Sequence, residues 1–268
     1  MSGTLTSPVV ATAPERPTFS RPPFARLVRV ELRKTFDTRA GWWLCASVGI
    51  LAVIATGVIL AFVPDSDITY EAFASAVGFP MAIILPMLAI LSVTSEWSQR
   101  SGLGTFTMVP HRGRVIRAKA AVAAIIGVVS MIIAMAVGAV GNVVGSAITG
   151  VDLVWDTSAA DLASIVIANL LGMAIGFTLA VLLRNSAAAI VGYFVYSFVL
   201  TGLSAALAAY QDWWHDLQPW LDFNFAQGSL FEGWPTGEQW AQLGVSGVFW
   251  LAIPLAIGLR LVVRSEVK

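Results

Sequence analysis

The chain has 268 residues, of which 57% are hydrophobic and only 12% are charged, and its mean hydropathy is +0.78. Soluble proteins average about 45–50% apolar and about 25% charged residues, so this chain has too few polar side chains to cover a globule in water. Its sixteen basic and sixteen acidic residues cancel, so net charge favours neither a nucleic-acid partner nor an anionic substrate. One cysteine (Cys45) and two histidines (His111, His215) exclude a disulfide framework and a zinc-type ligand cluster. Composition therefore predicts a membrane protein.

Residues 1–23 are rich in Thr, Ser, Pro and Ala and lack the basic start and apolar core of a signal peptide, so we expect a disordered tail. Apolar residues then recur at helical spacing opposite a face of arginines, which predicts an amphipathic helix in the membrane interface that bends into the first span near Gly41. A solvated helix with a chance apolar stripe is the alternative. The stripe consists of Phe24, Leu27, Val28, Leu32 and Phe36.

Glu31 is an exception on this helix, because it projects between Leu27 and Val28 on the apolar face. A carboxylate in that position needs a partner or a route to water. We expect either an arginine of the connection between the second and third spans, or a side chain that extends to solvent.

Six uncharged runs are long enough to cross a bilayer core of about 30 Å as helices, so the chain is predicted to be an all-α protein with six transmembrane helices. The runs are Trp42–Val63, Phe73–Val93, Ala120–Ile148, Leu162–Leu183, Ala187–Ala209 and about Trp240–Leu259. Residues 24–268 are thus expected to form one membrane domain. Pro80 and Pro86 in the second run and Pro254 in the sixth should kink their helices, each freeing a carbonyl that another helix must satisfy.

The connections between these runs differ sharply in charge. All sixteen basic residues fall on one side of the predicted membrane, and eleven of the sixteen acids fall on the other. The positive-inside rule therefore places both termini in the cytoplasm.

The cytoplasmic connection Ser95–Lys119 is too long for a bare turn. Leu103, Phe106 and Val109 follow a spacing of three and can form a short apolar rib, closed by Pro110. Apolar residues on a charged cytoplasmic segment are expected where another protein binds. Packing of the rib on this chain's own helix ends is the alternative.

The outer connection Tyr210–Glu238 is dense in tryptophan and phenylalanine, which is typical of the interfacial belt of a membrane. Two short helices that dip into the outer leaflet, broken near Pro219 and at Gly228, would satisfy their own backbone groups. Capture of a substrate by these aromatic rings is the alternative to anchoring.

The six predicted runs contain no Asp, Glu, Lys, Arg or His, which argues against a proton- or ion-coupled carrier and against an intramembrane hydrolase. The chain also lacks the GxxxxGK[ST] loop that binds ATP. Glycine pairs should allow close helix packing, at Gly141 and Gly145, Gly172 and Gly176, and Gly192 and Gly202. Asn142 and Asn169 are expected to form interhelical hydrogen bonds, with substrate contact as the alternative.

The order of amphipathic helix, two spans, cytoplasmic segment and four further spans resembles the permease subunit of type-2 ABC exporters from about Phe24 onward. The stretch ELRKTFDTRAGWW (Glu31–Trp43), with Glu31, Arg33 and Lys34, resembles the family's elbow helix. The connection between the fifth and sixth spans resembles its paired external re-entrant helices. The stretch SEWSQRSGLGTFTMVPHRGRVIRAK resembles its ATPase-coupling segment, in which the matching positions are Glu96, Gly104, Thr105, Pro110, Arg114 and Lys119. Together with the apolar rib of Leu103, Phe106 and Val109, these positions make up the predicted ATPase-coupling residues.

This resemblance implies a transporter of two permease chains and two separate ATPase subunits, with ATP and Mg²⁺ on the partner and no cofactor or metal on this chain. The chain itself is then a transport subunit rather than an enzyme. The family's pathway is lined mainly by the first, second and fifth spans, which makes Phe79, Met87, Tyr193 and Tyr196 candidates for a hydrophobic or amphipathic cargo. Packing against neighbouring helices is the alternative for all four.

Two other classes of function stay open from the sequence. One is an ATP-independent channel or carrier, and the other is a membrane anchor or assembly factor. A neighbouring reading frame with a nucleotide-binding loop would favour the transporter over both. The sequence does not indicate the cargo, the direction of transport, or whether the permease pairs with itself or with a related chain.

Overall fold

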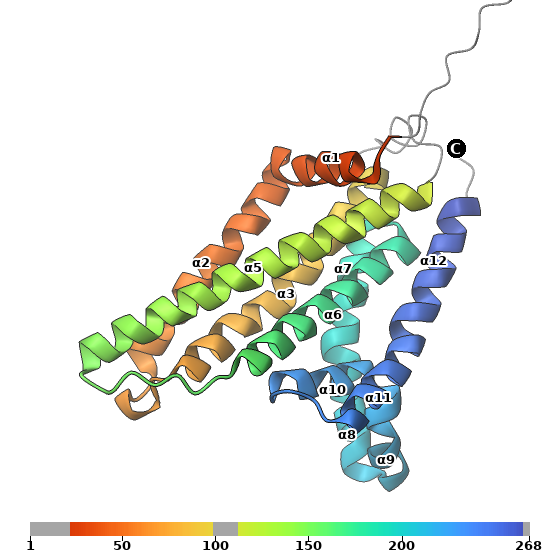
Figure 1. Ribbon diagram of the computed structural model, residues 1–268. Coiled ribbons are helices and arrows are strands. Elements are labelled where there is room, and N and C mark those ends of the chain that lie inside the picture. Colours follow the sequence, from red (N-terminus) through yellow and green to blue (C-terminus); the bar gives the residue numbers. More distant parts are fainter. Residues whose placement is uncertain (1–21, 99–111, 265–268) are drawn as a thin grey trace, which may run out of the picture.

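A computed structural model describes residues 22–98 and 112–264, and every regular element in those ranges is a helix (Figure 1). Six stretches are long and apolar enough to cross a membrane. The described part of the chain is thus all-helical, and its six candidate spans indicate a multi-pass membrane protein, as composition and the number of apolar runs predicted. The six candidate spans are Gly41–Phe62, Tyr70–Glu96, Gly113–Thr149, Ala159–Leu183, Ser186–Tyr210 and Gly237–Val262.

Helix α1 (Phe24–Asp37) lies across one end of the bundle, and α2 (Arg39–Phe62) runs away from it along the side (Figure 1). The chain turns at Thr38, whose backbone is extended and whose hydroxyl caps α2 by accepting a hydrogen bond from Gly41 N at 3.1 Å. A side chain at Gly41 would collide with the carbonyl of Thr35. The turn therefore lies three residues before the predicted bend, and Gly41 permits the close approach of the two helices.

Helices α3 (Tyr70–Ser98) and α6 (Ala159–Leu183) form the centre of the bundle and pack against each other. About half of each span is buried, against 17% for each of the last two spans. A short 3₁₀ turn, η1 (Asp65–Asp67), joins α2 to α3, and α5 (Arg112–Thr149) packs along α3 and α2. The hydrophobic core therefore surrounds α3 and α6, while the outer helices present apolar side chains outward.

Helices α3 and α5 extend beyond the apolar runs that predicted them. α3 continues past Val93 to Ser98, and α5 begins at Arg112 rather than near Ala120. Hydropathy detects only the apolar part of a helix, whereas polar and charged residues also form helical turns. As a result the structure includes Glu96 and Lys119 in candidate spans, and both side chains are buried.

The fifth and sixth spans each contain a π-helical segment, which the sequence analysis did not predict. The sixth span passes through its π segment just before Pro254, where the missing N–H interrupts ordinary helical hydrogen bonding. The fifth span consists of α7 (Ser186–Phe194), η2 (Val195–Leu200) and α8 (Thr201–Tyr210), and the sixth of α11 (Gly237–Gly247), η4 (Val248–Ala252) and α12 (Ile253–Arg264).

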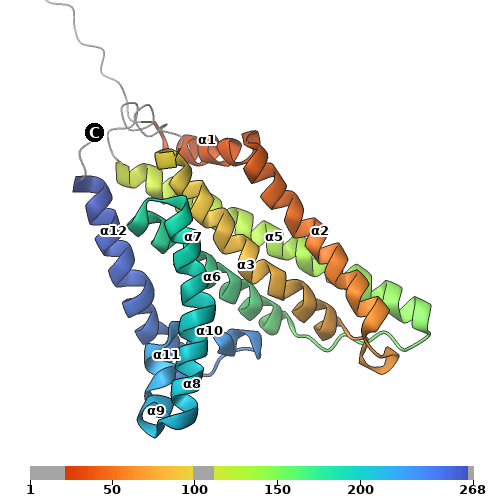
Figure 2. The ribbon, with the colours of Figure 1, turned by 180° about the vertical axis from the view of Figure 1, so that it is seen from behind.

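The connection between the fifth and sixth spans is helical and lies at the end of the bundle opposite α1 (Figure 2). It consists of α9 (Asp212–Leu221), α10 (Phe223–Gly228) and the 3₁₀ turn η3 (Ser229–Phe231). The first break falls at Asp222 rather than at Pro219, because the Asp222 carboxylate caps α10 by accepting hydrogen bonds from the backbone N–H groups of Asn224 and Phe225. Pro219 itself lies inside α9.

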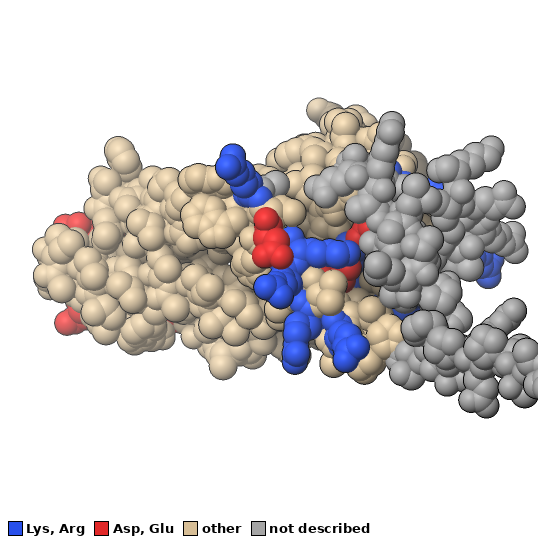
Figure 3. All heavy atoms as spheres, turned by 90° about the horizontal axis from the view of Figure 1, so that it is seen from above, with Lys and Arg blue, Asp and Glu red and all other residues tan. Residues whose placement is uncertain are grey.

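Lysine and arginine side chains gather at the α1 end of the molecule (Figure 3). The N-termini of α2 and α5, the C-termini of α3 and α12, and the turn between α6 and α7 all lie at this end (Figure 1). From there α2, α3 and α5 diverge from α8 and α12 toward the opposite end (Figures 1 and 2). The charge asymmetry of the sequence is therefore an asymmetry between the two ends of the bundle.

The predicted close packing at glycine occurs at some positions and not at others. A Cβ at Gly141 would lie 2.5 Å from the Thr56 methyl group, and one at Gly176 would lie 2.9 Å from the Pro86 carbonyl oxygen. By contrast, a Cβ at Gly202 meets no atom within 4 Å. Gly202 faces away from the other described helices, so its pairing with Gly192 has no packing role within this chain.

Candidate functional site

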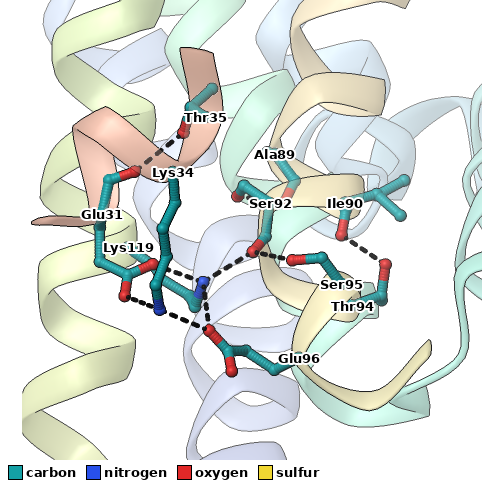
Figure 4. Close-up of polar contacts among 10 residues, drawn as sticks. All are labelled: Glu31, Lys34, Thr35, Ala89, Ile90, Ser92, Thr94, Ser95, Glu96 and Lys119. Atoms are coloured by element: carbon teal, nitrogen blue, oxygen red, sulfur yellow. Dashed lines mark hydrogen bonds and ion pairs between the residues drawn. The ribbon is translucent and has the colours of Figure 1, made fainter. Parts of the chain in front are cut away.

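Four charged side chains meet where α1 crosses α3 and α5, and we call them the charge cluster (Figure 4). The Lys119 ammonium of α5 lies 2.6 Å from Glu31 Oε2 and 3.2 Å from Glu96 Oε1. The Lys34 ammonium of α1 lies 2.8 Å from Glu31 Oε1 and 3.2 Å from the same oxygen of Glu96. Each carboxylate therefore bridges both lysines, and the cluster links three helices that are distant in sequence.

The position of Glu31 on the apolar face of α1 explains how the cluster forms. The helix lays this face on the bundle, so Glu31 is buried and 6% exposed. Its partner is Lys119, together with Lys34, rather than the predicted arginine or solvent. Lys119 also donates a hydrogen bond to the Ser92 carbonyl at 2.9 Å, so each of its three N–H groups has an acceptor.

The charge cluster is electrically balanced, with two carboxylates and two ammonium groups. Glu96 and Lys119 are each 4% exposed, so neither is solvated by bulk water. Buried charges persist when they are paired and hydrogen-bonded, but removal of one partner leaves a charge without compensation. The cluster is therefore sensitive to any displacement of α1, α3 or α5 relative to the other two helices.

Lys34 is the most accessible member of the charge cluster, since 43% of its side chain is exposed. Partial burial by itself lowers the pKa of Lys34, but the hydrogen bond and charge of Glu31, joined by those of Glu96, raise the pKa above its ordinary value of 10.5. Lys34 therefore carries its positive charge throughout the neutral range.

A cavity of about 350 Å³ lies beside the charge cluster, between α1, the start of α2, and α3. Its wall carries the cluster on one side and apolar residues such as Leu44 and Leu88 on the other. Ser186 at the start of α7 also reaches this cavity and donates a hydrogen bond to the Thr94 hydroxyl at 2.8 Å. The cavity therefore adjoins four of the six candidate spans.

Only some of the predicted ATPase-coupling residues fall in the part of the chain that the structure describes. Glu96 belongs to the charge cluster, and Arg114 donates a hydrogen bond to the Pro22 carbonyl just before α1. Arg33 is exposed and pairs with Asp37 at 3.8 Å, away from the cluster. The remaining positions, Leu103, Gly104, Thr105, Phe106, Val109 and Pro110, lie outside the described residues.

A second cavity, of about 240 Å³, lies between α3, α6, η2 and α10, and we call it the uncharged cavity. No Asp, Glu, Lys, Arg or His is among the described residues that line it. Three of the four predicted pathway residues, Phe79, Tyr193 and Tyr196, contribute to its wall, whereas Met87 packs partly buried against the core. The remaining wall includes Asn169, Ser197, Phe198, Asn224, Gln227 and Phe231.

A backbone carbonyl of α3 that a proline leaves free meets the fifth span at this cavity. Pro86 has no N–H, so the Ala82 carbonyl loses its partner within α3. The Tyr193 hydroxyl donates a hydrogen bond to that carbonyl at 2.9 Å. The prediction that another helix satisfies a freed carbonyl is thus confirmed at Pro86, and the buried Tyr193 side chain has a structural partner.

Two polar atoms at the uncharged cavity lack such a partner. The Asn169 amide donates to the Ile165 carbonyl of its own helix, while its Oδ1 has no hydrogen-bond partner among residues 22–98 and 112–264. The Tyr196 hydroxyl is likewise unpaired within those ranges. The interhelical hydrogen bond predicted for Asn169 is therefore wrong, as is the one for Asn142, which donates to the Val154 carbonyl in the connection after α5.

The two π-helical segments meet beside this cavity. The rings of Tyr196 in η2 and Trp250 in η4 lie 5.3 Å apart, and the Trp250 indole donates a hydrogen bond to the Leu221 carbonyl at the end of α9. Gln227 of α10 donates to the Ala168 carbonyl of α6 at 2.7 Å. π segments occur frequently at functional sites, so their position here favours a role for this cavity beyond packing.

Sequence reasoning missed two features of these sites. Lys119 was matched only to the cytoplasmic ATPase-coupling segment, although its place immediately before an apolar run was a signal that it could be buried. Gln227 and Asn224 appeared only as part of an aromatic connection. Within the described residues, no three His, Cys, Asp or Glu side chains are grouped so as to hold a metal ion.

No protein-family model and no curated protein matches the sequence, so similarity assigns the chain to no family.

Proposed function

We propose that the chain is the membrane-spanning permease subunit of a type-2 ABC exporter in the cell membrane. The observation that carries the proposal is the charge cluster, because it ties α1 to the C-terminal end of α3 and the N-terminal end of α5. Residues 99–111 join those two helix ends, so a partner that moves this segment acts directly on α1, α3 and α5.

In this proposal the α1 end of the bundle faces the cytoplasm. The concentration of Lys and Arg at that end supports the orientation through the positive-inside rule (Figure 3). α1 then serves as the elbow helix in the interface, and α9 and α10 as re-entrant helices near the outer surface. The aromatic side chains of α9 and α10 support the second assignment, since Trp213 and Phe225 are exposed.

A separate ATPase subunit supplies the energy, because the sequence contains no nucleotide-binding loop of its own. ATP and Mg²⁺ are bound by that partner, which docks on Leu103, Phe106 and Val109. A second permease chain, identical or related, completes the pathway. The exposed apolar side chains of α2 and of the fifth span, including Phe62 and Phe198, supply surface for that chain or for lipid.

The test is affinity purification of the tagged chain from its native membrane, followed by an ATPase assay of what co-purifies. We expect a protein with a nucleotide-binding loop to co-purify, and Leu103→Asp to abolish its retention while the chain remains in the membrane. A charged side chain in a buried contact typically costs several kcal/mol, which is enough to weaken docking severely.

Leu153→Asp is the matched control, because Leu153 is 43% exposed in the connection after α5, which lies at the opposite end of the bundle. It should leave the partner bound. Solute flux through the chain reconstituted alone, without ATP, would instead establish a channel or carrier. ATPase activity of the purified chain alone would contradict the proposal that a separate subunit hydrolyses ATP.

A further inference from the structure

The uncharged cavity combines features that packing alone does not explain. It lies at the junction of α3, α6, η2 and α10, beside both π segments, and its lining includes two side chains with unpaired polar atoms. We propose that this cavity binds the head of an uncharged amphipathic molecule that carries a hydroxyl or amide N–H donor. The proposal concerns binding by the chain itself, so it does not depend on whether an ATPase drives transport.

The lining determines the charge of the ligand. The described residues around the cavity supply amide and hydroxyl groups from Asn169, Asn224, Gln227 and Ser197, but no ionisable acid, base or histidine. A charged head group would lose its hydration without gaining a counter-ion, which disfavours its binding. A neutral polar head instead exchanges water for these amides and hydroxyls.

The unpaired atoms determine the hydrogen-bonding pattern of the ligand. Asn169 Oδ1 can only accept a hydrogen bond, whereas the Tyr196 hydroxyl can donate or accept. Asn169 is 2% exposed and Tyr196 is 7% exposed, so bulk water does not reach either group freely. A buried polar atom without a partner is unfavourable, and a donor on the ligand would supply the missing hydrogen bond. Tyr193 is not available for this role, because its hydroxyl already serves Ala82.

The shape of the cavity determines the apolar part of the ligand. Its volume of about 240 Å³ is below the roughly 300–1,000 Å³ of typical small-molecule pockets, so it holds a head group rather than a whole amphipath. Phe79 is 69% exposed and Phe198 is 52% exposed, which marks an open apolar side. The hydrocarbon part of the ligand therefore lies along these rings, outside the cavity.

The binding test uses the full-length chain in phosphatidylcholine nanodiscs and a photoactivatable diazirine analogue of monoolein, which has an uncharged head with two hydroxyls. After irradiation, peptide mapping should locate the label on residues of the cavity wall. Unlabelled monoolein should compete for labelling. Methyl oleate, which lacks a donor, and oleate, which is anionic, should compete at least about fivefold less effectively, as expected for the loss of one hydrogen bond.

Two variants remove the unpaired atoms at little cost to folding. Tyr196→Phe deletes a hydroxyl that has no partner in the described residues, so thermal stability should be unchanged or raised while labelling falls about fivefold. Asn169→Leu has nearly the same shape and should reduce labelling similarly. Tyr70→Phe is the matched control, because the Tyr70 hydroxyl contacts the Met135 carbonyl and does not line the cavity.

Equal labelling of the wild-type chain and Tyr196→Phe would overturn the proposal, since the hydroxyl would then be buried without a ligand. Equal competition by monoolein and methyl oleate would overturn it too, because the label would report lipid on the outer surface only. Stronger competition by oleate would contradict the uncharged class. Tyr196→Phe keeps the test decisive even if Asn169→Leu fails to fold.

Discussion

Lys119 is the residue whose removal should most disturb the charge cluster. Its ammonium serves Glu31, Glu96 and the Ser92 carbonyl, so Lys119→Met leaves two buried carboxylates with Lys34 as their only cation in the cluster. Loss of one partner from a buried ion pair typically costs about 3–5 kcal/mol. We expect a loss of that order in the free energy of unfolding, measured by denaturant titration in detergent micelles.

Arg33→Met is the control for this effect, because Arg33 forms an exposed pair with Asp37 and should change stability by about 0.5 kcal/mol or less. Adding Glu31→Gln to Lys119→Met should recover part of the loss, since the cluster then returns to a balance of one acid and one base. Equal effects of Lys119→Met and Arg33→Met would show that the buried cluster does not stabilise the junction.

Tyr193 and Tyr196 lie three residues apart, yet we predict that only the removal of the Tyr193 hydroxyl destabilises the chain. Tyr193→Phe leaves the Ala82 carbonyl without its partner, which should cost about 1–2 kcal/mol of unfolding free energy in the membrane. Tyr196→Phe removes a hydroxyl that is unpaired in the described chain and should cost nothing. Thermal unfolding of both variants in the same detergent measures the difference.

Pro86→Ala supplies the internal check on that explanation. Alanine restores the N–H that proline lacks, so the Ala82 carbonyl can bond within α3 and no longer needs Tyr193. In the Pro86→Ala background, Tyr193→Phe should therefore have a much smaller effect. If Tyr193→Phe destabilised the wild-type chain and the Pro86→Ala chain equally, the Ala82 hydrogen bond would not be the reason, and packing of the Tyr193 ring would be.

At the scale of helices, the contact of α6 with α3 at Pro86 depends on Gly176. A methyl group there would lie 2.9 Å from the Pro86 carbonyl oxygen, which cannot move without shifting the α3 backbone. Gly176→Ala should thus destabilise the chain by about 1–3 kcal/mol, the usual range for overpacking. Gly57→Ala in α2 should be neutral or slightly stabilising, since a Cβ at Gly57 meets nothing within 4 Å and alanine favours helix.

The helices differ in how far the sequence could predict them. The six spans and the short helices α1, α9 and α10 follow from hydropathy, helical spacing and turn residues, all of which are local signals. The predicted positions of the helix ends were less accurate, because α3 and α5 continue through polar turns beyond their apolar runs. The π segments were not predictable, since an extra residue in one turn leaves the apolar composition of a span unchanged.

The candidate sites were predictable to a smaller degree. That Glu31 needs a partner follows from its place on α1, but the identity of the partner depends on how α1 crosses α5, which is a long-range contact. Tyr193 and Tyr196, which were predicted to face a pathway, line the uncharged cavity, whereas Asn169 bonds within its own helix. Which partner each of these side chains finds depends on how the helices cross in three dimensions. Residue spacing along the chain does not indicate those crossings.

For the molecule as a whole, the concentration of basic residues at one end predicts how it sits in the membrane (Figure 3). After Cys45→Ser, cysteines introduced for the exposed residues Asp65 and Glu232 should react with a membrane-impermeant maleimide added outside intact cells. A cysteine in place of Arg33 should react only after permeabilisation. Reaction of Asp65→Cys exclusively from the cytoplasmic side would reverse the proposed orientation.

The large sequence separation between the members of the charge cluster has a consequence for the biosynthesis of the chain. Lys119 lies 88 residues after Glu31, so α1, α2 and α3 are synthesised before the lysine that neutralises Glu31 and Glu96. An intermediate with two spans carries both carboxylates with Lys34 alone, and it becomes complete only when α5 enters the membrane. Chains truncated before Lys119 should therefore be degraded faster than chains truncated just after the third span, and pulse-chase measurement of their half-lives would detect this step of biogenesis.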